Sequence, residues 1–154
     1  MRNTVLILIS CFFLIYSCSI NDNNLPEESN QQREVYQWHL INVSGGLAGV
    51  DIDYDLETII WVFNVGFSGN GGLIVENDNT DSSLEDGINT GSYNISMQVI
   101  ENGTYLFIEG EEFGKVSTPT SVDLIIDQNS LSTGTGADGY IYTFKRKVIL
   151  VDTN

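Results

Sequence analysis

Hydrophobic residues follow a period of two along most of the chain from about residue 35 to the C-terminus. The clearest case is GSYNISMQV at 91–99, where Tyr93, Ile95, Met97 and Val99 alternate with polar or small residues. A half-buried β-strand produces this pattern, because successive side chains point to opposite faces of the sheet. No window carries an apolar stripe at helical spacing over three turns. The sequence therefore predicts an all-β domain.

Eight segments have the alternation or composition of short strands. They are residues 35–43, 58–67, 71–77, 91–99, 103–110, 112–117, 121–127 and 139–150. Asn102-Gly103 and Asp138-Gly139 are hairpin signals between them. About eight short strands joined mostly by hairpins predict a small antiparallel up-and-down barrel in preference to a Greek-key sandwich. Closure of such a barrel also removes the exposed sheet edges.

The N-terminus, MRNTVLILISCFFLIYSC, has the features of a secretory signal. Arg2 is followed by an apolar run over 5–15 and by Ser17, directly before Cys18. The run is shorter than the roughly 20 residues of a spanning helix and has the length of a signal-peptide core. IYSC at 15–18 resembles the lipobox of bacterial lipoproteins, which implies cleavage before Cys18 and a lipid on this residue. An ordinary signal peptide cut elsewhere is the alternative.

Three regions follow from this interpretation. Residues 1–17 are a lipoprotein signal peptide, 18–33 are the lipidated Cys18 and a polar tether, and 34–154 are the barrel domain. Cys11 is removed and Cys18 is acylated, so the folded domain holds no cysteine, which excludes disulfides and thiolate metal sites. Ser19 fits known sorting signals for outer-membrane delivery. We therefore expect an outer-membrane lipoprotein of the cell envelope, on the periplasmic face or the cell surface.

The charge balance is strongly acidic. The chain has 21 Asp and Glu against 6 Lys and Arg, for a formal net charge of −15. Such a surface repels the phosphate backbone, so nucleic acid is excluded as a partner. It also repels anionic lipid, which leaves the acyl chain on Cys18 as the membrane link. The charge favours a basic protein partner or cations.

Four stretches together resemble the lipocalin-like domain of small bacterial lipoproteins, a calycin-type barrel. The stretches are WHLINVSGGLAG at 38–49, IWVFN at 60–64, GSYNI at 91–95 and DGYIYTFKR at 138–146, within a span of 35–147. The resemblance implies that Trp38 packs at the closed end of the barrel with Arg146 across its indole, as a cation–π pair. Tyr36 stands where true lipocalins have glycine.

The same resemblance implies a long loop between the first two strands, lying over the open end. SGGLAGVDIDYDLE at 44–57 occupies that position, and Gly45, Gly46 and Gly49 allow the chain to bend there. We expect this loop, together with Tyr54, to form the ligand mouth.

Asp51, Asp53 and Asp55 recur at every second position of this loop. An EF-hand starting at Asp51 would need Gly at its sixth position and Glu at its twelfth, but these are Leu56 and Val62. A looser calcium site on the three aspartates remains an alternative. The preferred interpretation is the solvated face of a strand, with no cofactor.

Catalytic signatures are missing from the sequence. His39 is the only histidine, and alternation places it opposite Trp38, facing outward as a satisfied or solvated side chain. There is no nucleophile elbow, phosphate loop or zinc-protease motif. We therefore expect a protein that is not an enzyme.

Two functions from different classes remain. In the first, a lipid-anchored envelope protein binds a small hydrophobic or amphipathic ligand inside the barrel. The candidate lining residues are Trp61 or Val62, Tyr93, Met97, Phe107, Tyr142 and Phe144. In the second, these bulky side chains fill the barrel, and the domain is an acidic protein-binding or inhibitory surface module, with calcium as a potential stabiliser.

Overall fold

The computed structural model describes residues 31–101, 103–136 and 138–153, and the regular structure in these residues is entirely β. The strands are β1 (Gln31–Gly45), β2 (Val50–Asp53), β3 (Ile59–Val65), β4 (Asn70–Asn77), β5 (Gly91–Ile100), β6 (Gly103–Ile108), β7 (Glu111–Ser117), β8 (Asp123–Asp127), β9 (Ser130–Leu131), β10 (Gly134–Thr135) and β11 (Tyr140–Thr153). The prediction of an all-β domain is confirmed. Within the described ranges, no helix has the length and hydrophobicity of a membrane span.

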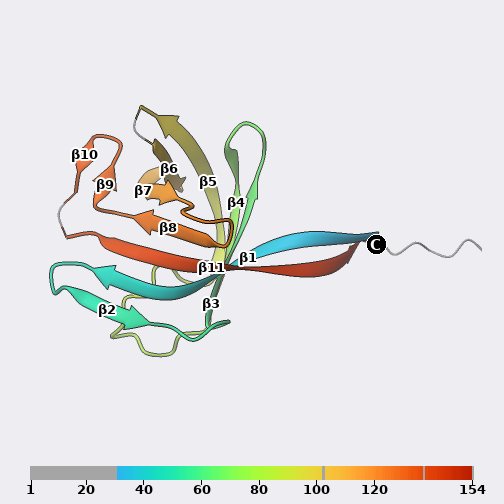
Figure 1. Cartoon of the computed structure of the whole chain (residues 1–154), viewed down its shortest axis with the longest axis horizontal. Helices are drawn as coiled ribbons and strands as arrows, with labels where there is room; N and C mark the ends of the chain where they lie inside the picture. The colour runs from blue at the N-terminus through green and yellow to red at the C-terminus, as the bar shows by residue number, and fades with distance from the viewer. Residues whose placement is uncertain (1–30, 102, 137, 154) are drawn as a thin grey trace, which may run out of the picture. The chain divides into compact units, whose positions relative to one another are not determined.

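Eight of the strands form a closed antiparallel barrel (Figure 1). The order around the barrel is β1, β3, β4, β5, β6, β7, β8 and β11, and β11 pairs again with β1 to close it. Each strand lies next to its neighbour in sequence, apart from the additional strand β2 and the small β9–β10 hairpin. The predicted up-and-down barrel of about eight strands is confirmed.

A β-bulge in β1 keeps apolar side chains inside the barrel. The register between β1 and β11 shifts between Leu40 and Asn42, which leaves Ile41 as the extra residue. Because one inserted residue reverses the alternation, Leu40 and Val43 both reach the core and are fully buried. The predicted alternation over 35–43 is thus interrupted near its end.

The segment expected to be a long mouth loop contains a turn and the strand β2, so the expected loop conformation was wrong. Residues 46–49 make a tight turn in which the amide of Gly49 donates to the carbonyl of Gly46 at 3.0 Å, and β2 then pairs with the end of β1. β3 pairs further back on the same side of β1, at Trp38 and His39. Residues 54–58, here called the strap, leave the sheet between these two pairings. The family resemblance implied a loop here, and the pairing of β2 with β1 is not visible in local sequence.

β1 and β11 continue beyond the barrel as a two-stranded ribbon (Figure 1). Their pairing runs out to Gln31 and Thr153, whereas β11 pairs with β8 only from Ile141 to Lys145. The ribbon begins at Gln31, so its first three residues fall within the region expected to be tether. Leu150 on the ribbon is 62% exposed.

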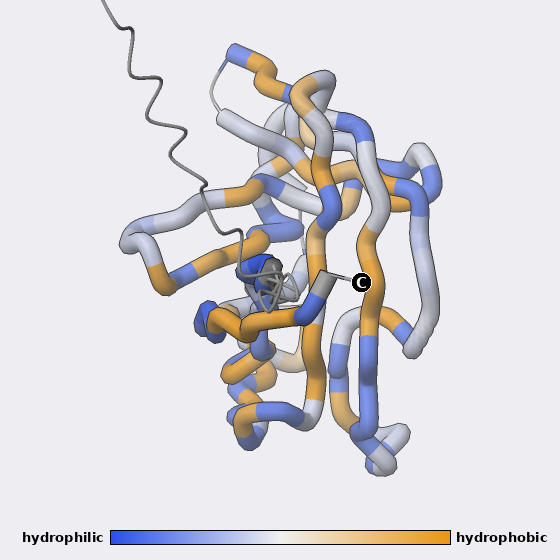
Figure 2. The backbone as a smooth tube through the Cα atoms, turned by 90° about the vertical axis from the view of Figure 1, so that its right-hand side faces the viewer, coloured by the Kyte–Doolittle hydropathy of each residue, from blue (hydrophilic) through white to orange (hydrophobic). Residues whose placement is uncertain are grey.

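The hydrophobic core lies inside the barrel. Figure 2 shows hydrophobic residues recurring along the strands with hydrophilic residues between them. The buried members of this cluster are Leu40, Val43, Ile59, Trp61, Leu73, Val75, Ile95, Leu106, Leu124, Ile126, Tyr142 and Phe144. Residues 31–154 form one compact unit. A chain that starts at Ser19 therefore contains the whole folding unit with its own core.

Leu106→Ala should lower the free energy of unfolding by about 2–5 kcal/mol, because the fully buried side chain leaves a cavity in the core. The matched control is Leu47→Ala, in the turn between β1 and β2, where the leucine is 86% exposed and the change should stay within about 0.5 kcal/mol. Urea unfolding followed by tryptophan fluorescence measures both. Equal losses in the two variants would contradict the assigned core.

Candidate functional site

Aromatic side chains fill the interior of the barrel. Trp61 is fully buried, with ring centroids 5.0 Å from Phe144 and 5.7 Å from Phe113, and Phe113 stacks on Tyr142 at 5.5 Å. An eight-stranded barrel has room either for its own side chains or for one small ligand. These contacts indicate that side chains occupy the space.

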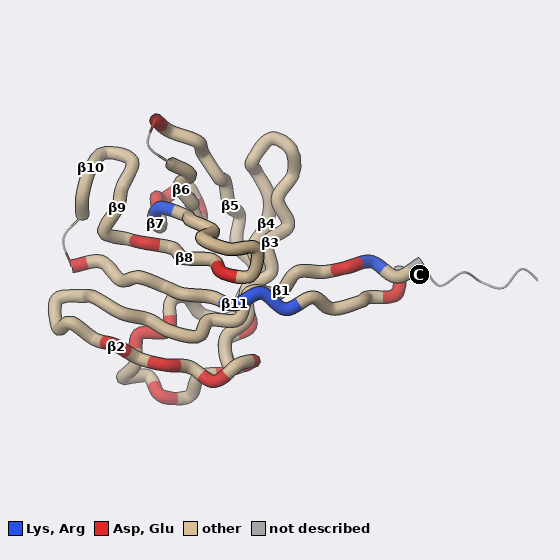
Figure 3. Tube along the Cα trace, in the orientation of Figure 1, with Lys and Arg blue, Asp and Glu red and all other residues tan. Residues whose placement is uncertain are grey.

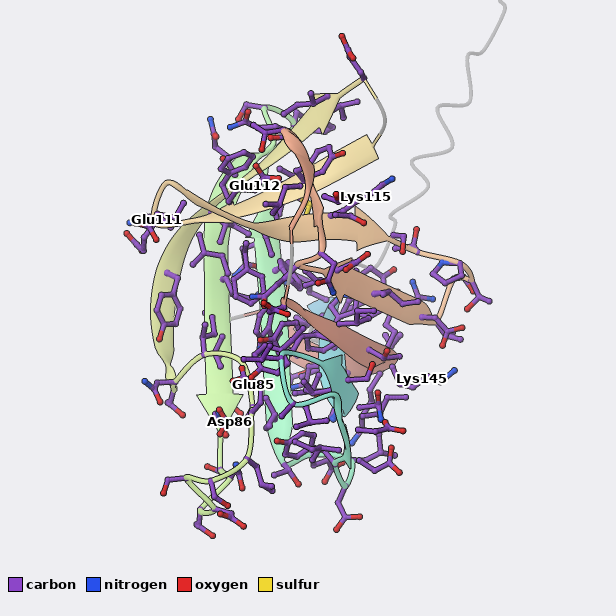
Figure 4. The ribbon with its side chains drawn as sticks, turned by 90° about the vertical axis from the view of Figure 1, so that its left-hand side faces the viewer. Glu85, Asp86, Glu111, Glu112, Lys115 and Lys145 are labelled. Atoms are coloured by element: carbon purple, nitrogen blue, oxygen red, sulfur yellow. The ribbon has the colours of Figure 1, made fainter. Side chains whose placement is uncertain are left out.

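One end of the barrel is covered by residues 78–90, the connection between β4 and β5, here called the lid. The hydroxyl of Tyr142 donates to a carboxylate oxygen of Glu85 at 2.8 Å, and the hydroxyl of Tyr54 donates to the backbone carbonyl of Glu85 at 2.6 Å. Gly87 has φ of 89°, and a Cβ there would lie 3.4 Å from the Trp61 ring. Figure 4 shows Glu85 and Asp86 at the end of the barrel opposite Glu111 and Glu112. The lid is therefore joined to the interior by hydrogen bonds.

Burial and the acids of the lid act together on these phenols. Burial, followed by the charges of Asp86, Glu85 and Asp81, raises the pKa of Tyr54 to about 12. The pKa of Tyr142 is raised as well, first by burial and then by its hydrogen bond to Glu85. Both hydroxyls therefore remain protonated donors at neutral pH.

The lid is shaped by short polar side chains bonded to backbone two residues onward. The amide of Asn79 donates to the Asn77 side chain at 3.0 Å, and the amide of Asp81 donates to the Asn79 side chain at 3.1 Å. The hydroxyl of Ser83 donates to the Asp81 carboxylate at 2.6 Å and its amide donates at 3.0 Å, and these bonds, the hydroxyl first, lower the pKa of Asp81. These Asx turns need no partner elsewhere in the fold. The run of Asn, Asp and Ser is thus the local signal for this loop.

The candidate lining residues divide into three groups. Trp61, Tyr142 and Phe144 are buried in the core, while Tyr93 and Met97 are partly buried against it. Phe107 is the third case, because it is neither buried in the core nor packed against it. Leu106 and Ile108 on either side of it contact the core, so alternation along β6 directs Phe107 outward. The inward assignment of Phe107 was wrong, because the inward positions of β6 are those of Leu106 and Ile108.

The predicted stacking of Arg146 on Trp38 is replaced by another contact. Trp38 and Arg146 are Cα partners between β1 and β11, and Trp38 packs against the core. The guanidinium carbon of Arg146 lies 4.8 Å from the ring centroid of Tyr36. A diagonal neighbour on the same face of a strand pair is within reach of a long side chain, which accounts for the change of partner.

The alternating aspartates lie on the solvated side of β2. Asp51 and Asp53 are exposed, and the side-chain amide of Asn42 donates to both, at 2.8 and 3.0 Å. Asp55 is exposed in the strap. In the described part of the chain, no three His, Cys, Asp or Glu side chains are grouped closely enough to hold a metal ion. Cys18 lies outside the described residues.

An open pocket of about 290 Å³ lies on the outside of the barrel, between the strap and β11. Its lining residues are His39, Leu56, Glu57, Lys145, Arg146 and Lys147. Lys147 pairs with Glu57 and Lys145 pairs with Asp123. The sequence analysis did not predict this pocket. The run of three bases in an acidic chain was its only local signal.

His39 is buried and does not occupy the solvated position that the sequence offered as one alternative. It faces away from the core beside Lys145, its partner on β11, yet only 2% of its surface is exposed. The strap covers it, and the amide of Glu57 donates to the imidazole Nδ1 at 3.1 Å. The other ring nitrogen, Nε2, has no hydrogen-bond partner in the described structure. Burial, and then the charge of Lys147, lowers the pKa of His39.

Comparison of the chain with protein-family models, with curated proteins and with solved structures found no match. The similarity to lipocalin-like lipoproteins therefore stays a prediction. A function has to be argued from the barrel and its surface.

The stability of the protein should decrease as pH falls below about 6.5. The pKa of His39 is lower in the folded state than in the unfolded chain, so on acidification the unfolded chain binds a proton at a higher pH than the folded protein does. Protonation therefore favours the unfolded chain, and the stability that is present above about pH 6.5 is lost as the pH falls. His39 is the only histidine, so His39→Gln should flatten the dependence between about pH 7.5 and about pH 6. Urea unfolding at each pH measures this. An unchanged slope in the variant would rule out His39 as the source.

Proposed function

We propose that the protein is a lipid-anchored, non-enzymatic binding protein of the bacterial cell envelope that acts through the outer surface of a filled barrel. The observation that carries the proposal is the interior itself. Trp61, Tyr142 and Phe144 are at most 2% exposed. Trp61 packs on Phe144, and Tyr142 stacks on Phe113 and donates a hydrogen bond to Glu85 of the lid. A ligand or partner then binds outside without disrupting this core.

Support for the anchor comes from the sequence. The apolar run, Ser17 and Cys18 resemble a lipoprotein signal, and the segment between Cys18 and β1 is polar. At about 5–6 Å times the square root of its length, such a tether keeps the domain within a few nanometres of the bilayer. The outer membrane is the proposed location, and the barrel would be held there for binding.

The surface offers two chemistries to such partners. Figure 3 shows acidic residues over β2 and the nearby loop, and a separate basic run on β11 where the ribbon leaves the barrel. The acidic region, which includes the exposed Asp51, Asp53 and Asp81, suits a basic protein partner. The outer pocket suits a small amphipathic ligand, because Leu56 and three bases line it.

A second candidate function is an interior carrier with a lid that opens. One observation favours it: the indole Nε1 of Trp61 is buried and has no hydrogen-bond partner among the described residues. A polar ligand group beneath the lid would satisfy this donor. Opening would have to break the bonds of Glu85 to Tyr54 and Tyr142.

Cys18→Ala should abolish fatty-acid labelling of the protein in cells and release it from the membrane fraction. Cys11→Ala is the matched control, because this cysteine lies in the segment that the proposal removes, and its loss should leave the labelling unchanged. Metabolic labelling with an alkyne fatty acid and cell fractionation measure both effects. Labelling that survives in Cys18→Ala would overturn the proposed anchor.

Native mass spectrometry of the chain from Ser19 to Asn154, purified without denaturation, should show a bare protein with and without calcium. The large side chains packed inside the barrel favour an interior without lipid, and the aspartates of β2 are exposed. Glu85→Gln, which weakens the lid, and Glu111→Gln at the other end of the barrel should also be bare. A lipid-sized mass that is bound to the unmodified chain and to Glu111→Gln, but not to Glu85→Gln, would favour the interior carrier. Stoichiometric calcium would instead revive the calcium site.

A further inference from the structure

The pocket outside the barrel concentrates positive charge in a strongly acidic chain. Half of the six Lys and Arg of the sequence are the consecutive Lys145, Arg146 and Lys147, and all three line this pocket. The others, Arg2, Arg33 and Lys115, are elsewhere in the sequence. A basic run of this kind on a chain of net charge −15 favours an anion at that point of the surface.

The ion pairs already present leave the bases able to bind another anion. Lys145 pairs with Asp123 and Lys147 pairs with Glu57, but the lysine side chains are 48% and 51% exposed. Exposed pairs of this kind contribute little, and each ammonium group has three donors. Arg146 contacts the uncharged ring of Tyr36. Its guanidinium lies on the face of β11 opposite His39, so Lys145 and Lys147, each with three donors and one carboxylate partner, are the bases that an incoming anion would contact.

His39 adds a donor that lacks an acceptor. Because Nδ1 accepts the amide of Glu57, the proton of the neutral ring is assigned to Nε2. This nitrogen is buried without a partner in the part of the chain that the structure describes. Leaving a buried donor unpaired is costly, and native proteins usually provide an acceptor from protein, water or ligand. An anion entering beside the strap would provide one.

The strap supplies the apolar part of the site. Leu56 lies on the pocket wall and is 64% exposed, an unusual position for a leucine next to two lysines. The volume of about 290 Å³ corresponds to about ten water molecules. That space holds an acidic headgroup and the first carbons of a chain, but not a whole lipid.

We propose that this pocket binds the acidic headgroup of an amphiphilic anion, a phosphate or carboxylate joined to an apolar chain. Lys145 and Lys147 contact the charge, His39 donates through Nε2 as the strap adjusts, and Leu56 contacts the first carbons of the chain. The inference rests on the proposed function, since it names a ligand for the outer surface of the filled barrel.

Decyl phosphate is the test ligand, added below its critical micelle concentration to the chain from Ser19 to Asn154. Calorimetry should show saturable binding, and Lys145→Gln and Lys147→Gln should each weaken it by about tenfold. Lys115→Gln is the matched control on β7, well separated from Lys145 in Figure 4, and should bind normally. Inorganic phosphate and decyl maltoside should both bind far more weakly, because each lacks one half of the interaction.

The NMR signals of the single histidine provide a second measurement, because a variant that only changes the stability of the protein would not alter how they respond to the ligand. Decyl phosphate should shift the ring ¹H and ¹⁵N signals of His39, which need no assignment because the chain has no other histidine. Absent binding, equal binding by all lysine variants, or an unmoved His39 signal would overturn the proposal. Phosphate alone binding as tightly as decyl phosphate would overturn its amphiphilic part.

Two sources of the headgroup are separated by vesicles. Co-sedimentation with phosphatidylglycerol vesicles that is lost in Lys147→Gln identifies a bilayer lipid as a ligand of the pocket. Binding of decyl phosphate without co-sedimentation identifies a free amphiphile, and either result supports the site. The proposed function is tested by other measurements. Acylation that survives in Cys18→Ala, or a lipid mass bound beneath the lid, would contradict the proposed function without bearing on ligand binding in the outer pocket.

Discussion

The antiparallel pairing of β1 with β11 is the contact on which the rest of the structure depends. It joins the two ends of the sheet, and it runs from Gln31 opposite Thr153 to Gly45 opposite Tyr140. Without it, both strands would be open edges, which in a chain so rich in β-forming residues are sites of aggregation. The pairing also spans almost the whole described chain, so it closes a long loop before the barrel gains its core.

The same pairing sets where binding chemistry is placed. Inside, it brings Leu40 against Phe144, and the aromatic cluster around Trp61 then occupies the barrel. Outside, it places His39 opposite Lys145, next to a strap that β2 and β3 hold against β1. The interior of the barrel therefore holds a packed aromatic cluster. Among the described residues, two buried polar atoms have no hydrogen-bond partner, Trp61 Nε1 inside the barrel and His39 Nε2 outside it.

Sequence patterns located most of the strands because strand formation has a local signature. The alternation in GSYNISMQV matches β5, and the apolar run after Thr58 matches β3. The direction of Tyr93 and Met97 followed from the same alternation, whereas the apolar run at 58–67 left Trp61 and Val62 as alternatives. The alternation failed at Phe107, where size outweighed parity, and beyond Leu40, where the bulge at Ile41 inverts the faces of β1. A bulge depends on the partner strand, and the residues around it carry no reliable signal for it.

The sequence by itself determined the all-β class, the approximate strand positions, the acidic balance and the local Asx turns of residues 77–83, since each depends on neighbouring residues or on composition. Tertiary structure decided that the lid is held by Tyr54 and Tyr142, that Arg146 lies over Tyr36, and that a strap buries an outward-facing histidine against β11. These contacts join residues that are far apart in the chain. Burial and hydrogen bonding at such positions are set by which surfaces meet after the barrel closes, and not by the local period of the sequence.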